Sequence, residues 1–286
     1  MHNRLQLVFI RLYFWMTSTL LPSFAVYSAH KLFHFPINTK RKNRNALTLP
    51  SPKRFNVTFY DDLTLQCYRW GEASHPKVLL VHGWSTTAQS MTHFTHALLQ
   101  KKYQVISYDA LRHGESQKSF SDLASWADSV RAVMLDIGEV ECIIAHSFGG
   151  AAVTVASKLG LATKKLALIA PIHDIAAVAD DFAERFGIPL DIIKKMRSYT
   201  WEKNKEHFNK YGTNWNDIVH SKFKVPTLLI HDTDDKEIGV SHSKQICKMW
   251  QWAQLIETKG LGHRKILDSQ KVVDDVLHFI QAKQEV

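Results

Sequence analysis

The stretch of sequence that decides the fold runs from Glu141 to Gly150 and reads ECIIAHSFGG. Its first half is a short apolar run, which is typical of a strand buried on both faces. Glycines after Ser147 and Phe148 allow the strand to turn sharply into a helix, which would leave the serine hydroxyl exposed at the turn. Taken alone, Ser147 is better explained as a helix N-cap, and Ala145 stands where this motif usually has glycine. The rest of the sequence decides between the two interpretations.

Similar apolar runs recur along the chain, and helical patterns separate them. Continuous apolarity indicates strands buried on both faces, and strands that alternate with helices build a doubly wound, mostly parallel α/β sheet. Two earlier runs, residues 55–60 and 64–70, alternate with period two and predict an N-terminal antiparallel hairpin. The expected parallel strands are residues 77–82, 103–108, 141–145, 165–170, 225–231 and 253–258. The expected helices are residues 91–100, 123–137, 149–159, 241–252 and 269–281.

One interval is longer than this alternation requires. Residues 172–224 separate two predicted neighbouring strands, and they are rich in helix formers and aromatic residues. We therefore expect a small helical insertion over the carboxyl ends of the strands, where open α/β sheets bind ligands. The folded domain is expected to span residues 53–286, behind a leader of residues 1–52 that ends in a proline-rich stretch.

Polar motifs stand at or just after the ends of the predicted strands. They are VHGW (81–84), DALRHGES (109–116), AHSFGG (145–150), HDTDD (231–235) and GLGH (260–263). Because the carboxyl ends of parallel strands meet at one edge of a sheet, we expect these motifs to converge. Ser147, Asp235 and His263 follow one another in the chain order nucleophile, acid and base that accompanies a serine on such a turn.

The five motifs together resemble the α/β-hydrolase fold superfamily, and the resemblance covers about residues 53–284. It implies that Ser147 is the nucleophile and that His263 is the general base that activates it and then protonates the leaving group. It also implies an oxyanion hole formed by the backbone N–H groups of Trp84 and Phe148.

The acid of the triad is the least certain of these assignments, because three aspartates lie close together. The resemblance favours Asp235, since the family's acid lies four residues beyond the position held here by His231. Asp235 would then fix the tautomer of His263 and stabilise its protonated form. Asp232 and Asp234 are the alternatives.

Three further residues are expected to support the site. The resemblance suggests that His82 and Gly83 organise the loop that offers the Trp84 N–H group, while Gly149 keeps the turn after the nucleophile free of a side chain. Relatives with an insertion at the corresponding place use it as a lid over the acyl pocket, so the resemblance implies the same role for residues 172–224.

The predicted function is hydrolysis of a carboxylic ester, which we expect to be a hydrophobic small molecule, through an acyl intermediate on Ser147. Other acyl chemistry on the same triad is the alternative: a thioesterase, an amidase, a C–C bond hydrolase or an acyltransferase. A non-catalytic, ligand-binding member of the fold is a further alternative. Neither a dinucleotide fingerprint, a P-loop nor a metal-binding motif occurs, so we predict no cofactor and no metal.

The formal net charge of +9 resides in the first 54 residues, which contain nine Lys or Arg and no Asp or Glu. A nucleic-acid-binding domain would carry its basic excess across the folded surface, so we expect no nucleic-acid partner. The charge instead favours contact of residues 1–44 with an anionic membrane surface.

The apolar stretch from Leu5 to Tyr27 has three interpretations. It can be a helix in or on a membrane, followed by the basic flank 40–44, which would keep the domain cytoplasmic. Arg11, which interrupts the stretch, favours a helix docked on the protein itself. A signal peptide with a cleavage site near residues 23–25 would export the protein. We expect a cytoplasmic, membrane-associated protein, with export as the alternative; the sequence does not indicate an oligomeric state.

Overall fold

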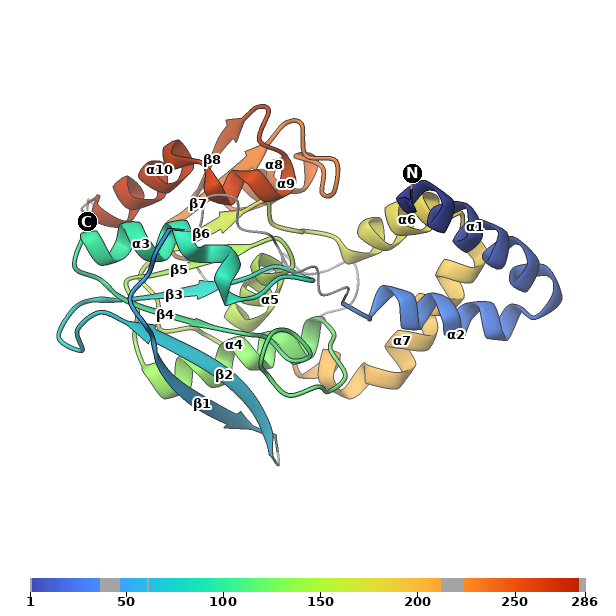
Figure 1. Cartoon of the computed structure of the whole chain (residues 1–286), viewed down its shortest axis with the longest axis horizontal. Coiled ribbons are helices and arrows are strands. Elements are labelled where there is room, and N and C mark those ends of the chain that lie inside the picture. Colours follow the sequence, from blue (N-terminus) through green and yellow to red (C-terminus); the bar gives the residue numbers. More distant parts are fainter. Residues whose placement is uncertain (1, 37–46, 61, 212–223, 283–286) are drawn as a thin grey trace. The chain divides into compact units, whose positions relative to one another are not determined.

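An eight-stranded sheet organises the chain from residue 53 onward (Figure 1). The computed structural model describes residues 2–36, 47–60, 62–211 and 224–282. The strand order is β1-β2-β4-β3-β5-β6-β7-β8, in which β1 and β2 are antiparallel to each other, β2 is antiparallel to β4, and the remaining pairs are parallel. This is the predicted α/β fold with an antiparallel start. The strands are β1 (Lys53–Phe59), β2 (Leu63–Trp70), β3 (Lys77–Val81), β4 (Gln104–Tyr108), β5 (Cys142–His146), β6 (Leu166–Ile169), β7 (Thr227–Asp232) and β8 (Ala253–Thr258).

The central strands are buried on both faces, as their continuous apolarity predicted. In β3, Val78, Leu79, Leu80 and Val81 are all inaccessible to solvent, although successive side chains point to opposite faces. Helices therefore have to cover both sides of the sheet. They are α3 (Thr92–Gln100), α4 (Leu123–Ile137), α5 (Phe148–Ser157), α8 (Ser241–Met249), the short α9 (Gly262–Lys265) and α10 (Gln270–Gln281).

On one face of the sheet, α3 and α10 pack against alternate residues of the central strands, and together they form a continuous apolar core. Helices α4 and α5 pack on each other and on the other side of the sheet (Figure 1). Local sequence defines where α4 begins: Asp122 and Ser125 form a reciprocal capping box, in which each side chain accepts a backbone N–H of the other. The helix ends at Ile137, and the next residue is Gly138, whose φ of 74° suits glycine.

The chain divides into two compact units, and the sheet belongs to the one formed by Ile37–His173 and Val219–Val286. The other unit joins the leader, Met1–Pro36, to Asp174–Ile218. We call them the sheet unit and the helical unit. The helical unit contains α1 (His2–Leu20), α2 (Pro22–Phe33), α6 (Ile175–Phe186) and α7 (Leu190–Lys210). The last two helices occupy the interval between β6 and β7 in which the sequence indicated an insertion.

The leader does not form one helix through Leu5–Tyr27. It breaks at Leu21, because Pro22 lacks the N–H group that a continuing helix needs and instead begins α2 as its first residue. Within the helical unit, α1 packs on α2 and α6, and α2 packs on α7, around a shared apolar core. Among the residues that the structure describes, none form a helix long and apolar enough to cross a membrane.

Two predictions fall partly outside the described residues. The basic flank at residues 40–44 lies in the interval 37–46, and the predicted insertion 172–224 includes residues 212–223. The role of the insertion as a lid stays a prediction.

Candidate active site

Ser147 lies at the turn between β5 and α5, with a φ of 54° and a ψ of −122°. A positive φ is strained for a residue with a side chain, at a cost of about 1–3 kcal/mol, and such strain is concentrated at functional sites. The turn is also tightly packed: a Cβ atom on Gly149 would lie 2.3 Å from the carbonyl oxygen of His82. Glycine is therefore required at position 149, and the alanine at position 145 is accommodated in the buried strand.

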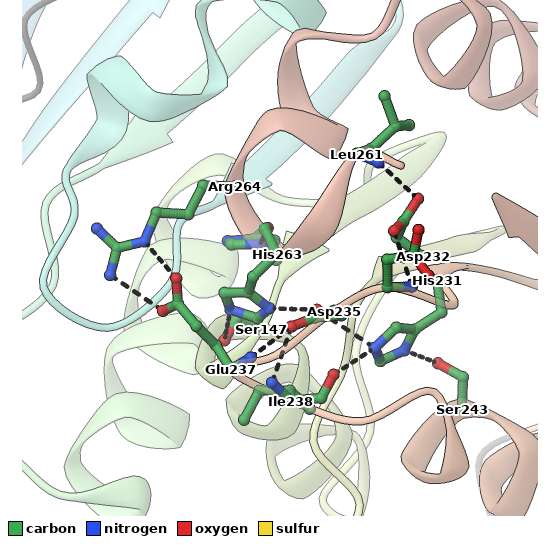
Figure 2. Close-up of polar contacts among 12 residues, drawn as sticks. Ser147, His231, Asp232, Asp235, Glu237, Ile238, Ser243, Leu261, His263 and Arg264 are labelled. Atoms are coloured by element: carbon green, nitrogen blue, oxygen red, sulfur yellow. Dashed lines mark hydrogen bonds and ion pairs between the residues drawn. The ribbon is translucent and has the colours of Figure 1, made fainter. Parts of the chain in front are cut away.

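The structure brings Ser147, His263 and Asp235 into one hydrogen-bonded line (Figure 2). Nε2 of His263 lies 2.9 Å from Oγ of Ser147, and Nδ1 of His263 lies 2.7 Å from Oδ2 of Asp235. An ionised carboxylate can only accept hydrogen bonds, so the Nδ1–H group donates to Asp235 and Nε2 is left to accept the serine proton. Although Asp235 lies 88 positions after Ser147 in the chain, the ends of β5 and β7 and the short helix α9 place all three side chains together.

The surroundings of Asp235 keep it ionised. Its Oδ1 atom accepts the backbone N–H groups of Glu237 and Ile238, and its side chain is fully buried. Burial alone would raise the pKa of Asp235, but hydrogen bonds from His231 and His263, together with the charge of His263, hold that pKa well below the usual range of a carboxyl group.

The other two aspartates of this loop have different surroundings. Asp232 ends β7, where its carboxylate accepts hydrogen bonds from the Thr258 hydroxyl and from the N–H groups of Leu261 and Asp234. It thereby fixes the loop that carries α9. The side chain of Asp234 is on the exposed part of the same turn. Of the three carboxylates, Asp235 is the one that is hydrogen-bonded to His263.

The two residues predicted to form the oxyanion hole lie beside the nucleophile. Phe148 follows Ser147 as the first residue of α5, and Trp84 contacts Phe148 with ring centroids 5.2 Å apart. A Cβ atom on Gly83 would lie 3.1 Å from Cβ of Ser147, so the backbone that leads into Trp84 passes directly over the serine. Stabilisation of an oxyanion by the two N–H groups stays a prediction.

Two buried histidines hold the loop that contains Trp84. Nε2 of His82 accepts the backbone N–H of Ala110, and its Nδ1–H donates to the Gly83 carbonyl group at 2.8 Å. Nε2 of His113 accepts the N–H of Ser85, the residue after Trp84, at 3.0 Å. Burial lowers the pKa of His82 to about 4 and that of His113 to about 3, so both rings are neutral near pH 7 and can accept these bonds.

The sequence indicated a supporting role for His82 but not for His113 or Trp126. Trp126 lies in α4, is fully buried, and contacts Trp84, His113 and Phe148 with centroid distances between 5.0 and 5.8 Å. The motif that contains His113 was noted, and its position after β4 was the available signal. Trp126 has no such signal, because an aromatic residue in a helix usually packs in the core.

His146 is not positioned as a general base. Its Nε2–H donates to the backbone carbonyl of His263 at 2.9 Å, and burial lowers its pKa well below the ordinary value. The bond ties the strand that ends at the nucleophile to the short helix that carries the proposed base. This hydrogen bond gives His146 a positioning role.

Comparison with known proteins gives the family. A model of the alpha/beta hydrolase family matches residues 78–275, and the chain belongs to that family. An uncharacterized protein of Mycobacterium tuberculosis is 37% identical over 81 residues, which is 27% of this chain and 23% of that protein. The AB hydrolase superfamily protein YisY of Bacillus subtilis is 20% identical over 245 residues, covering 70% of this chain and 89% of that protein.

Solved structures of low sequence identity share the fold. An esterase from Rhodococcus sp. aligns with a TM-score of 0.58 and 20% identity, over 82% of this chain and 99% of the esterase. A bacterial membrane phospholipase A aligns with a TM-score of 0.61 and 15% identity, over 98% of this chain and 97% of the phospholipase. Further structural neighbours include another esterase and a thioesterase domain.

Proposed function

We propose that this protein is a serine hydrolase that cleaves a carboxylic ester through an acyl intermediate on Ser147. The observation that carries the proposal is the hydrogen-bonded line from Ser147 through His263 to Asp235, with both distances below 3 Å. Such an arrangement lets a neutral imidazole take the serine proton while the carboxylate balances the charge that develops on the ring.

In the first half of the proposed reaction, the Ser147 oxygen attacks the ester carbonyl carbon and its proton moves to Nε2 of His263. The carbonyl oxygen becomes negatively charged and accepts hydrogen bonds from the N–H groups of Trp84 and Phe148, each worth about 3 kcal/mol in related chemistry. The tetrahedral intermediate then expels the alcohol, which takes the proton from His263 and leaves the acyl group on Ser147.

In the second half, water attacks the acyl-serine ester and gives a proton to Nε2 of His263. Collapse of the second tetrahedral intermediate releases the carboxylic acid, and the proton returns to the Ser147 oxygen. Throughout, the Nδ1–H bond to Asp235 keeps the ring oriented, and the depressed pKa of Asp235 keeps that acceptor ionised.

The fit to a hydrophobic ester rests on the aromatic side chains around the turn. Trp84, Trp126 and Phe148 contact one another beside the nucleophile. Thioesters and amides pass through the same kind of tetrahedral intermediate, so the leaving group has to be determined by experiment. The fold shared with a membrane phospholipase A is a reason to include a phospholipid among the esters tested.

The test is labelling with a fluorophosphonate, followed by rates on matched ester, thioester and amide substrates of several acyl lengths. We expect wild type to be labelled and Ser147→Ala to be unlabelled, with a fall in ester turnover of roughly 10⁴-fold or more. Ser157→Ala, in the same helix α5, is the matched control and should retain both labelling and turnover. Full ester turnover by Ser147→Ala would contradict the proposal, and a higher rate on thioesters would reassign the substrate class.

A further inference from the structure

The helical unit exposes large apolar side chains of the kind that water-soluble proteins normally bury in their core. Twelve of the nineteen large apolar residues that are exposed in the described chain lie within the first 36 residues. Exposed apolar residues scattered singly need no explanation, but a contiguous set marks a surface that contacts another apolar phase.

On α1, seven of the eight exposed large apolar residues form a single stripe, and the eighth is Tyr13. Adjacent residues of an α-helix differ by about 100°, so the seven residues of the stripe fall within roughly 140° of the helix circumference. Phe9 and Trp15 are 67% and 68% exposed. The stripe consists of Leu5, Val8, Phe9, Leu12, Trp15, Met16 and Leu20.

The opposite side of α1 is anchored within the helical unit. Phe14, diametrically opposite the stripe, is 2% exposed and belongs to a core shared with α2, α6 and α7. The guanidinium group of Arg11 donates to the Arg185 carbonyl at the end of α6. His30 of α2 is hydrogen-bonded to the hydroxyl of Thr200 in α7 at 2.9 Å. The stripe therefore faces away from packed neighbours on a fixed helix.

Helix α2 also exposes aromatic and basic residues at helical spacing. Phe24 and Tyr27 are 49% and 47% exposed. The ammonium group of Lys31, one turn after Tyr27, lies 5.5 Å from the centroid of the Tyr27 ring. Aromatic rings next to a cation are typical of side chains at the boundary between lipid headgroups and acyl chains.

The charge of the leader indicates what this surface contacts. Residues 1–52 contain seven basic residues and no acidic one, and they attract anionic lipid headgroups, with about 1 kcal/mol for each Lys or Arg near the surface. The same charge would repel a second copy of the leader, so self-association through this surface is disfavoured.

We propose that α1 and α2 form a membrane-docking face that lies in the plane of an anionic bilayer, with the α1 stripe inserted among the acyl chains. A stripe that runs along about 23 Å of helix requires the axis to lie parallel to the bilayer surface. A spanning orientation would instead bring Arg11 and the Arg185 carbonyl that it contacts into the hydrocarbon. This mode of docking is independent of the chemistry at Ser147.

The test is flotation of the full-length protein with vesicles of phosphatidylcholine alone and of phosphatidylcholine mixed with phosphatidylglycerol. We expect wild type to float with the mixed vesicles, and Phe9→Ser/Trp15→Ser to lose about tenfold or more of its partitioning. Leu135→Ser is the matched control, because Leu135 is 80% exposed on α4 in the sheet unit, and its partitioning should equal that of wild type. Hydrolysis of a water-soluble ester should be the same in all three proteins.

The depth of insertion distinguishes docking in the plane from spanning. Trp15 fluorescence, obtained as the difference between wild type and Trp15→Phe, should shift to the blue on addition of mixed vesicles. Lipids with a quencher near the headgroup should quench it more strongly than lipids with a quencher at the end of the acyl chain. Three results would overturn the proposal. The first is stronger quenching of Trp15 at the bilayer centre, and the second is equal flotation of Phe9→Ser/Trp15→Ser and wild type. The third is a wild-type dimer in the absence of lipid that Phe9→Ser/Trp15→Ser makes monomeric.

Discussion

The two units of the chain use the same kinds of side chain in opposite ways. In the sheet unit, Trp126 is fully buried, and Ser147 and His263 are only 5% and 9% exposed. In the helical unit, Trp15 is 68% exposed on a helix whose opposite side is packed. Reaction geometry requires groups held to a fraction of an ångström, which burial and hydrogen bonds provide. A surface for a fluid bilayer requires exposed apolar area and charge but no fixed partner atoms.

Loss of the Asp235 carboxylate, the proposed acid, should produce the largest effect. Asp235→Asn leaves a side chain of the same shape that can donate toward Nδ1 of His263 and thus favour the wrong tautomer. We expect the kcat for a water-soluble ester to fall by roughly 10³–10⁴-fold, with little change in Tm.

Asp234→Asn is the matched control, one residue away on the same loop and on its exposed side. It should keep nearly wild-type kcat. Equal losses in the two variants would mean that the loop as a whole, rather than the bond between Asp235 and His263, supports turnover.

The next largest effect is a difference in the free energy of unfolding between substitutions on the two sides of α1. Phe14→Ala removes a buried ring from the core of the helical unit and should lower the free energy of unfolding of that unit by about 3–5 kcal/mol. Phe9→Ala makes the same chemical change on the exposed stripe and should stay within about 0.5 kcal/mol of wild type. Urea unfolding followed by circular dichroism measures both.

The two variants should differ in the opposite sense on vesicles, where Phe9→Ala weakens partitioning. Equal stability of Phe14→Ala and Phe9→Ala would show that α1 is not anchored through Phe14. It would contradict the inference that one side of α1 is packed and the other exposed.

Sequence patterns were sufficient for the sheet because its signals are local. Each parallel strand is a short apolar run, and α4 begins and ends as its sequence indicated, at Leu123 and Ile137. The convergence of Ser147, His263 and the aspartate cluster was predicted from their places after parallel strands, since parallel strands end at one edge. Which of the three aspartates contacts His263 is determined by the turn Asp232–Asp235, and it was the family resemblance that favoured Asp235.

Contacts between segments distant in sequence could not be predicted in the same way. Arg11 favoured a helix docked on the protein itself, but the leader does not indicate that the partners are α6 and α7, because the sequence of an apolar helix does not specify which helix it packs on. The hydrogen bond from the Ser85 N–H to His113 depends on how two loops approach each other. Exposure of the stripe on α1 also becomes apparent only when the packed side containing Phe14 is known.

The smallest predicted effect concerns pH and the buried histidines of the sheet unit. Burial lowers the pKa of His82 to about 4, whereas the same ring in the unfolded chain titrates near pH 6.5. Below about pH 6.5 the unfolded chain therefore binds a proton that the folded site excludes, so the free energy of unfolding falls as the pH decreases toward 4. Above pH 6.5 this contribution is constant. The loss attributable to His82 should be about 1–3 kcal/mol by pH 4.5.

The variant His82→Asn removes this titrating ring and should show a shallower decline, even though it starts from a lower stability because the bonds to Ala110 and Gly83 change. His278→Asn, at an exposed position on α10 of the same unit, should keep the wild-type slope. Urea unfolding at several values between pH 7.5 and pH 4.5 compares the three slopes, since each protein serves as its own reference at the higher pH. A wild-type stability that rises toward pH 4.5, or a His82→Asn slope equal to that of His278→Asn, would show that neutral burial of His82 does not contribute to the acid sensitivity of the sheet unit.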